Sequence, residues 1–343
     1  MIKTILTPID GSKNAQSALE LSADLAAKYD ARLLLLHVGM RDGDVPEELY
    51  EAAARELQDA EDSGEETGIY PHPSRHLRIL EYLGHLLLRD AQQYAEANGA
   101  KRAETLLDFG DTGERILHHA KHESADLIVM GSRGLNELEG LFLGSVSHKV
   151  VHLAPCSCVT VRGFETEDAF EGIKTVLVPT DGSDHAAKAL DLASDVSAKY
   201  GAKLILLYAA RSDASLDRLR ATVDVAELSA ATREELDADR LAPVVPFGGA
   251  YIPPAVSDEA LREIGEQILA RGRKAAEKKG VVKLEVVLAE DDPARAILKT
   301  AESQQADLIV MGSRGLGEVT GFLAGSVSYK VNHAAPCSCL VVR

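Results

Sequence analysis

A glycine-containing stretch that occurs twice is the strongest constraint on how this chain of 343 residues can fold. The motif Met-Gly-Ser-Arg-Gly occupies residues 130–134 and 311–315. After nine further residues, each copy is followed by Gly-Ser-Val-Ser, at 144–147 and at 325–328. The same motif with the same spacing in both halves predicts a tandem repeat of one structural unit.

Each copy of the motif lies between an apolar run and an amphipathic segment. The runs at 125–129 and 306–310 are typical of buried parallel strands, and the segments at 146–153 and 327–334 have helical spacing. The first turn of a helix offers unpaired backbone N–H groups and a partial positive charge, and glycine lets an anion approach the main chain. The pattern therefore predicts that these loops bind phosphate.

The hydroxyl groups of Ser145 and Ser326 stand at the two expected helix starts. Each can cap its helix or bind a phosphate oxygen. A tight glycine turn without a ligand would explain one copy of the motif equally well. Two copies with identical spacing favour the phosphate-binding interpretation.

Strands and helices alternate along both halves. In the first half we predict strands over 3–9, 31–38, 102–109, 125–129 and 157–162, and helices over 15–29, 46–62, 77–98 and 111–123. This alternation predicts an α/β fold with a doubly wound parallel sheet in each half. Asp10 and Asp181 follow the two first strands. Each carboxylate would face a glycine loop if the first and fourth strands are neighbours.

The repeat also defines the domains. We predict a first domain over 1–162, a short acidic linker over 163–172 and a second domain over 173–343, with a longer segment at 211–256. Residues 211–240 are predicted to form one charged helix with an apolar stripe. The proline-rich stretch that follows would pack on its own domain, cover the second site or contact another copy of the chain.

The chain is strongly acidic, with 54 acidic and 37 basic residues and a net charge of −17. This balance argues against broad binding of nucleic acid or of an anionic membrane, because both attract basic surfaces. The first residues run directly into a strand pattern without a signal peptide, and no apolar run reaches the length of a membrane span. We therefore expect a cytoplasmic protein.

Together these features resemble the universal stress protein family. Both halves carry the pattern Gly-x2-Gly-x9-Gly-Ser, an Asp-Gly-Ser turn after the first strand and Pro-Cys before the last strand. The resemblance covers almost the whole chain, as a tandem of two family domains. It implies two open five-stranded parallel sheets in the order 3-2-1-4-5, a Rossmann-like fold of the adenine-nucleotide alpha hydrolase type. It also implies ATP, with or without magnesium, as the ligand of the glycine motif.

Carried over residue by residue, the resemblance implies one nucleotide site in each half. In the first half Asp10 would hold the ribose hydroxyls, Val38 would contact adenine, and the triphosphate would be held by Gly131, Gly134, Gly144, Ser145 and Val146. In the second half the matching residues are Asp181, Ala209, Gly312, Gly315, Gly325, Ser326 and Val327. Ala209 is a smaller apolar contact for the base than Val38. The preceding residue is His37 in the first half and Tyr208 in the second, so the two sites need not bind ATP equally.

Few residues near the glycine motifs suit catalysis. Phosphoryl transfer needs a cation clamp, metal-binding carboxylates and a positioned base, and the loops offer only Arg133, Arg314 and the first-strand aspartates. His118 and His122 have a helical spacing that could bind a metal, but a solvated helix face explains them more simply. The Cys-x-Cys pairs fit apolar strand positions better than a zinc or redox site. We expect no catalytic residue, no metal site and at most weak ATP hydrolysis.

Three functions are compatible with these residues. The first is an ATP-binding stress or regulatory protein, with an adenine nucleotide and an unknown regulatory protein as partners and a homodimer as a further candidate. The second is a slow ATPase or a phosphotransfer enzyme. The third is a nucleotide-free interaction module, against which the intact glycines of both halves count. A P-loop enzyme is disfavoured, because the chain has no Gly-x4-Gly-Lys-Ser/Thr motif.

Overall fold

The computed structural model describes residues 2–39, 45, 47–64, 69, 74–134, 143–162, 170–209, 216–237, 256–315 and 325–343. These residues belong to two compact units, Met1–Gly172 and Ile173–Arg343. The predicted proline-rich loop at 241–254 and most of the predicted linker lie outside the described residues.

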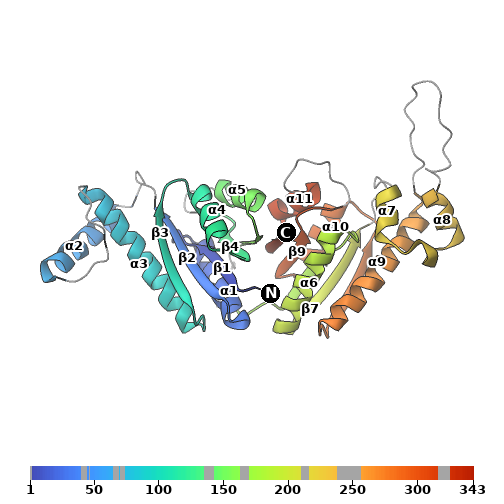
Figure 1. The fold of residues 1–343 in the computed structure, drawn as a ribbon, viewed down its shortest axis with the longest axis horizontal. Coiled ribbons are helices and arrows are strands. Elements are labelled where there is room, and N and C mark those ends of the chain that lie inside the picture. Colours follow the sequence, from blue (N-terminus) through green and yellow to red (C-terminus); the bar gives the residue numbers. More distant parts are fainter. Residues whose placement is uncertain are drawn as a thin grey trace, which may run out of the picture. The chain divides into compact units, whose positions relative to one another are not determined.

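The first unit contains the helices and strands that the sequence pattern predicts, with bounds that differ by no more than two residues (Figure 1). Its strands are β1 (Thr4–Pro8), β2 (Arg32–Gly39), β3 (Ala103–Phe109), β4 (Leu127–Gly131) and β5 (Ser157–Val161). Its helices are α1 (Lys13–Tyr29), α2 (Glu47–Ser63), α3 (Arg75–Ala97), α4 (Thr112–His122) and α5 (Ser145–Leu153).

The strands of this unit form a parallel sheet in the order β3-β2-β1-β4-β5. Strand β2 lies inside the sheet, and its four consecutive leucines at 33–36 are fully buried. A continuous apolar run suits a parallel strand that is covered on both faces. The predicted parallel α/β class is therefore confirmed. The strand order reverses between β1 and β4, and ligands of such sheets bind outside the strand ends at this point.

Helices cover both faces of the sheet. Helices α1 and α3 pack together, and Gly84 of α3 lies against the side chains of His37 and Leu107. Because side chains alternate along a strand, the next residues, Val38 and Asp108, face the opposite side. Helix α4 lies there, since its side chains bond to Asp108, and α5 packs against α4. Within the described ranges, no helix of the chain combines the length and the apolar character that a membrane span needs.

The second unit repeats this architecture with additional helices. Its strands are β6 (Thr175–Pro179), β7 (Lys203–Ala209), β8 (Leu284–Ala289), β9 (Leu308–Gly312) and β10 (Ser338–Val342), in the order β8-β7-β6-β9-β10. The repeated helices are α6 (Asp184–Tyr200), α9 (Asp258–Lys278), α10 (Pro293–Ser303) and α11 (Ser326–Ala334). The longer segment adds α7 (Leu216–Thr222), the 3₁₀ turn η1 (Val225–Glu227) and α8 (Ala230–Asp237).

These added elements correct one prediction. The apolar stripe predicts a single helix over 211–240, whereas the described part of this segment is broken into α7, η1 and α8. The side chain of Thr222 donates to a carbonyl of its own helix, and those of Asp224 and Ser229 accept backbone amides two and three residues further on. Such local bonds offer the backbone an alternative to a continuous helix, and so they end one helix and begin the next.

Candidate functional site

A turn that carries an aspartate follows the first strand of each unit. Asp10 Oδ1 accepts a hydrogen bond from the Ser12 amide at 2.9 Å, and Asp181 Oδ1 accepts one from the Ser183 amide at 3.0 Å. The glycine in the middle of each turn has a φ of 79°, in the left-handed region that favours glycine. Both turns therefore hold one carboxylate oxygen, Oδ1, in place.

The second glycine of each motif lies directly against this carboxylate. An ideal Cβ on Gly134 would be 2.8 Å from Asp10 Oδ2, and one on Gly315 would be 2.5 Å from Asp181 Oδ2. Both distances are shorter than real Cβ contacts, so a side chain at either position would displace the carboxylate. The pairing of β1 with β4, and of β6 with β9, brings the predicted carboxylate and glycine loop together in both units.

The first glycine of each motif has a different neighbour. An ideal Cβ on Gly131 would lie 2.8 Å from Asn14 Cβ and 2.9 Å from the Asn14 carbonyl carbon, in the first turn of α1. One on Gly312 would lie 2.8 Å from the carbonyl carbon of His185 in α6. Close packing of helix on strand accounts for these two glycines without a ligand. Their predicted contact with phosphate stays a prediction.

Hydrogen bonds tie the helix start to the end of the fourth strand. Ser132 O accepts from the Gly144 amide at 2.8 Å and from Ser147 Oγ at 2.7 Å. The second unit repeats both bonds with Ser313, Gly325 and Ser328. The spacing of the motif predicts no role for these serines, although their recurrence in both copies is a signal for one.

The helix start itself corrects one expectation. Gly144 is the residue that caps α5, with a φ of −66°, and Ser145 is the first helical residue. The same holds for Gly325 and Ser326 in α11. The capping alternative for these two serines is therefore wrong. Both serines are exposed, and Val146, which follows Ser145, is half-buried. The first turn therefore presents a hydroxyl and backbone amides outward.

Two buried polar atoms of the first loop have no hydrogen-bond partner in the part of the chain that the structure describes. They are Ser132 Oγ and Arg133 Nε. Ser132 is 2% exposed, and buried polar groups in proteins normally have a partner. Both atoms carry a hydrogen that can be donated to an anion. This loop therefore fits a bound phosphate group.

The positions predicted to contact the base lie at the ends of the second strands. Val38 and Ala209 are both half-buried, on β2 and at the end of β7. The residue before Val38 is His37, whose Nδ1 lies 2.7 Å from Ile9 O. The residue before Ala209 is Tyr208, which is 3% exposed and packs against Gly265 of α9. The two units therefore differ beside the expected base position.

Burial raises the pKa of Tyr208 to about 12, and the negative charge of Asp181 adds to this effect. The folded pKa thus exceeds the ordinary value of 10.0. In the folded chain this phenol stays neutral between those two values, whereas in the unfolded chain it ionises. The contribution of Tyr208 to stability is therefore complete below about pH 10 and is lost as the pH rises towards about 12.

Replacement of Tyr208 by phenylalanine is expected to lower the tyrosinate absorbance that appears near pH 12 in the folded chain by the share of one residue. An ultraviolet pH titration of both proteins measures this difference. The free energy of unfolding of the variant should also fall less steeply as the pH rises over the same range. The variant lacks the phenol whose ionisation favours the unfolded state. If the absorbance difference between the two proteins appears near pH 10 instead, that result would contradict the burial of this phenol beside Asp181.

A polar cluster lies beside Val38 in the first unit. Asp108, the register partner of Val38, accepts a hydrogen bond from Arg115 Nε at 2.6 Å and lies 2.7 Å from His119 Nε2. Partial burial acts to raise the pKa of Asp108, but the hydrogen bonds from His119 and Arg115 outweigh it, so the pKa lies below its usual value. The equivalent positions of the second unit hold Ala289, Ala296 and Thr300.

The histidines predicted at helical spacing also lie on α4. The rings of His118 and His122 stack with their centroids 6.0 Å apart. Within the described ranges, no group of three or more His, Cys, Asp or Glu residues is arranged to hold a metal ion. None of the four cysteines, all of them described, forms a disulfide, and Cys158 and Cys339 are buried on the last strands of the two sheets.

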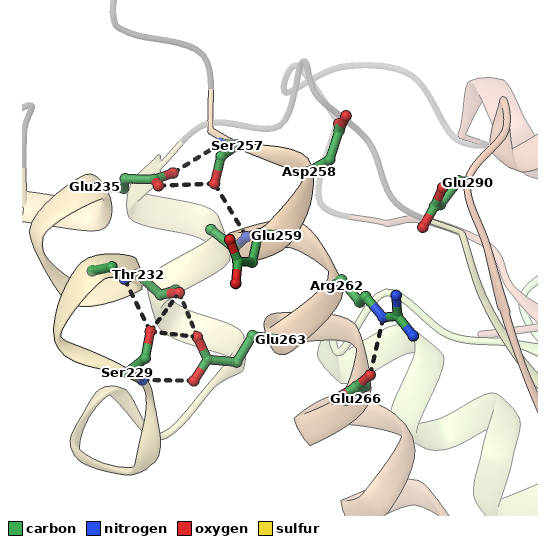
Figure 2. Close-up of a pocket in the computed structure, with 12 residues that line it drawn as sticks. Ser229, Thr232, Glu235, Ser257, Asp258, Glu259, Arg262, Glu263, Glu266 and Glu290 are labelled. Atoms are coloured by element: carbon green, nitrogen blue, oxygen red, sulfur yellow. Dashed lines mark hydrogen bonds and ion pairs between the residues drawn. The ribbon is translucent and has the colours of Figure 1, made fainter.

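A cavity of about 630 Å³ lies elsewhere in the second unit, among α8, the start of α9 and the residue that follows β8 (Figure 2). Its lining includes Glu235, Glu263, Glu266 and Glu290, together with Arg262. None of the predicted site residues lines it. Its excess of carboxylates opposes binding of a phosphate group, so this cavity is not the candidate nucleotide site.

Fold and loops together define the class of this protein. Each unit has a parallel α/β sheet, an aspartate after the first strand and a glycine loop between the fourth strand and the next helix. The chain belongs to the universal stress protein family, whose sequence model matches residues 1–162 and 172–343. It is a tandem member, with one family domain in each half.

Individual relatives agree with this assignment. The chain is 34% identical over 166 residues to the universal stress protein YxiE of Bacillus subtilis, with 47% of this chain and 100% of YxiE covered. It is 27% identical over 342 residues to a universal stress protein of Mycolicibacterium smegmatis, with 99% of this chain and 96% of the relative covered. The solved structure of a universal stress protein from Archaeoglobus fulgidus matches with a TM-score of 0.58 and 23% identity, over 99% of this chain and 98% of that chain. This structural likeness supports the fold.

Proposed function

We propose that the chain is an ATP-binding regulatory protein of stress responses, with one nucleotide site in each unit. The observation that carries this proposal is the close approach of Gly134 to the Asp10 carboxylate and its repetition at Gly315 and Asp181. A carboxylate accepts hydrogen bonds from two ribose hydroxyls, and a helix start binds phosphate. In both units the carboxylate meets the second glycine of the loop that leads to this helix start.

The roles within the first site follow from the positions of its residues. Asp10 Oδ1 is held by the Ser12 amide, so the carboxylate has a fixed orientation towards a ribose. The start of α5 is tied to Ser132 and presents the amides of its first turn to the phosphates. Ser132 Oγ and Arg133 Nε are further donors for an anion, and Val38 forms an apolar wall for adenine. Magnesium, when bound, would balance the charge of the triphosphate.

Binding is the activity that these roles support, because each of them positions or neutralises a nucleotide. Two alternatives remain. One is slow hydrolysis or phosphotransfer, and the other is a nucleotide-free interaction module. The repetition of the carboxylate contact in both units favours binding over the interaction module, because a module without ligand has no need of a carboxylate against each glycine loop. A change of shape or of protein partner upon ATP binding would give the chain its regulatory role.

Calorimetry of the freshly purified, nucleotide-stripped chain is expected to show two ATP molecules bound. Asp10→Asn and Asp181→Asn should each weaken one of the two binding events, and the double variant should weaken both. Asparagine keeps the size of the side chain and an acceptor for the turn amide but loses the charge that strengthens the bonds to ribose. Each substitution should weaken its own site about 100-fold, since bonds to charged groups contribute about 1.5–3 kcal/mol each.

Asp90→Asn is the matched control, because this exposed aspartate of α3 pairs only with the neighbouring Arg89 in the described ion pairs. It should leave the number of bound ATP molecules and their affinities unchanged. Mass spectrometry of the nucleotide that the protein retains on purification identifies the natural ligand independently. Unchanged ATP binding in the double aspartate variant, or no binding by the unaltered chain, would contradict the proposal.

A further inference from the structure

Helix α7 covers the turn that carries the aspartate of the second unit. An ideal Cβ on Gly182 would lie 2.8 Å from Thr222 Cβ and 3.2 Å from Thr222 Cγ2, at the end of α7. Thr222 is buried and Gly182 is half-buried. The contact therefore sits next to Asp181 in the chain, on the turn that fixes its carboxylate.

The matching turn of the first unit has no such cover among the described residues. An ideal Cβ on Gly11 would have Leu87 Cδ1 as its nearest neighbour, at 3.8 Å, and Gly11 is exposed. Leu87 on α3 corresponds to Ile268 on α9, whose Cδ1 would lie 3.0 Å from the ideal Cβ on Gly182. The helix beneath the turn is thus common to both units, although its side chain approaches more closely in the second, and among the described residues the contact with Thr222 is found only in the second.

Helix α7 is held in this position by α9. The amide of Asp224 donates to Gln267 Oε1 at 2.7 Å, and Gln267 Nε2 donates to Asp224 O at 3.0 Å. These two bonds fix the chain directly after α7. An ion pair between Arg220 and Asp237 joins α7 to α8, and Arg220 is largely buried. The end of α7 therefore cannot move away from Gly182 without breaking bonds to two other helices.

Helix α8 is anchored on α9 in turn (Figure 2). Glu263 of α9 accepts hydrogen bonds from the Ser229 amide at 2.6 Å and from Ser229 Oγ at 2.9 Å, and its carboxylate also accepts from Thr232. Glu235 of α8 accepts from the Ser257 amide and hydroxyl, both at 2.8 Å, at the start of α9. Helices α7, α8 and α9 thus form one connected frame, which we call the α7–α9 frame.

We propose that Thr222 is a positioning residue of the second nucleotide site, and that the α7–α9 frame holds the turn of Asp181 in its binding geometry. The inference rests on the proposed function, since it concerns the affinity of one of the two ATP sites. A turn held in the bound conformation loses less freedom on binding, which increases affinity. The second site is therefore preorganised by a contact that the described first site lacks.

Two glycine variants test this inference with matched backbone strain. Gly11 and Gly182 have the same φ of 79°, so alanine at either position carries the same left-handed conformation. The Cβ of Gly182→Ala would lie 2.8 Å from Thr222 Cβ and 3.0 Å from Ile268 Cδ1. That of Gly11→Ala would meet only Leu87 Cδ1 among the described residues, at 3.8 Å. We expect Gly182→Ala to weaken ATP binding at the second site about tenfold more than Gly11→Ala weakens it at the first, as overpacking of a fixed contact predicts. Each site is measured alone by calorimetry, in the Asp10→Asn or the Asp181→Asn background.

Milder variants at Thr222 separate positioning from general folding. Thr222→Ser keeps the hydroxyl bond to Leu219 O and loses the methyl group that faces Gly182. Thr222→Val keeps the methyl group and loses the bond. Hydrogen exchange of the Ser183 amide, which bonds to Asp181, should accelerate in Thr222→Ser and stay slow in Thr222→Val. The Ser12 amide of the first unit is the internal control and should not change.

The outcomes distinguish this inference from the proposed function. If the unaltered chain binds no ATP, the proposed function fails and the inference fails with it. If both sites bind ATP but the two glycine variants weaken them equally, the proposed function stands and the inference is overturned. Unchanged exchange of the Ser183 amide in Thr222→Ser, with a folded second unit by circular dichroism, overturns it as well.

Discussion

Replacing Gly131 with alanine is expected to lower the free energy of unfolding of the first unit by about 1–3 kcal/mol, the usual effect of overpacking. The added Cβ would lie 2.8–3.0 Å from Asn14 and from the amide of Ala15. These atoms belong largely to the backbone of α1, which cannot rotate aside as a flexible side chain does. Urea denaturation measures the effect as a lower midpoint with an unchanged slope. Gly312→Ala should destabilise the second unit similarly, because its Cβ would meet the backbone of His185.

Gly134→Ala is the matched control, because its added Cβ would meet only the Asp10 side chain among the described residues. A carboxylate can move, so the free energy of unfolding should change by no more than about 0.5 kcal/mol, as for most exposed positions. The two glycines stand in one motif, and yet Gly131 lies against the backbone of α1 and Gly134 against the Asp10 carboxylate. Equal destabilisation by both variants would show this division to be wrong.

The sequence pattern was sufficient for the elements of each sheet, because these elements have strong and simple periodicity. The unbroken leucines at 33–36 predict a buried strand over 31–38, and β2 spans Arg32–Gly39. The pattern failed over 211–240, where Leu216 and Leu219 are buried but Ala226 is exposed. There the helix is ended by side chains that bond to nearby amides, an effect that apolar spacing does not record.

The residues of the candidate site, and the facing of each carboxylate and its glycine loop, could be predicted from the repeat and from the family resemblance, but the individual atomic contacts could not. The approach of Gly134 to Asp10 depends on the pairing of β1 with β4, which joins segments far apart in the chain. The packing role of Gly131 depends on how closely α1 approaches β4. Thr222 lies in a segment that the repeat identifies only as an insertion. Its place against Gly182 is visible only once the helices are packed.

Gly134→Ala combined with Gly315→Ala is expected to weaken ATP binding about 100-fold at both sites while leaving the fold intact. The added Cβ atoms would lie 2.8 Å and 2.5 Å from the Oδ2 atoms of Asp10 and Asp181, so both carboxylates must turn away from the ribose position. Loss of one or two hydrogen bonds to a charged acceptor removes about 1.5–3 kcal/mol each, and every 1.4 kcal/mol is tenfold in affinity.

A double-mutant cycle makes this expectation specific. If alanine acts by displacing the carboxylate, the glycine substitutions should add little to the loss in a chain that already carries Asp10→Asn and Asp181→Asn, because the same interaction is removed twice. Calorimetric titration of ATP into the four proteins of the cycle measures this coupling. Fully additive losses would mean that glycine and aspartate contribute to nucleotide binding independently. That result would contradict a site built on their contact, even if both groups of variants bind ATP more weakly.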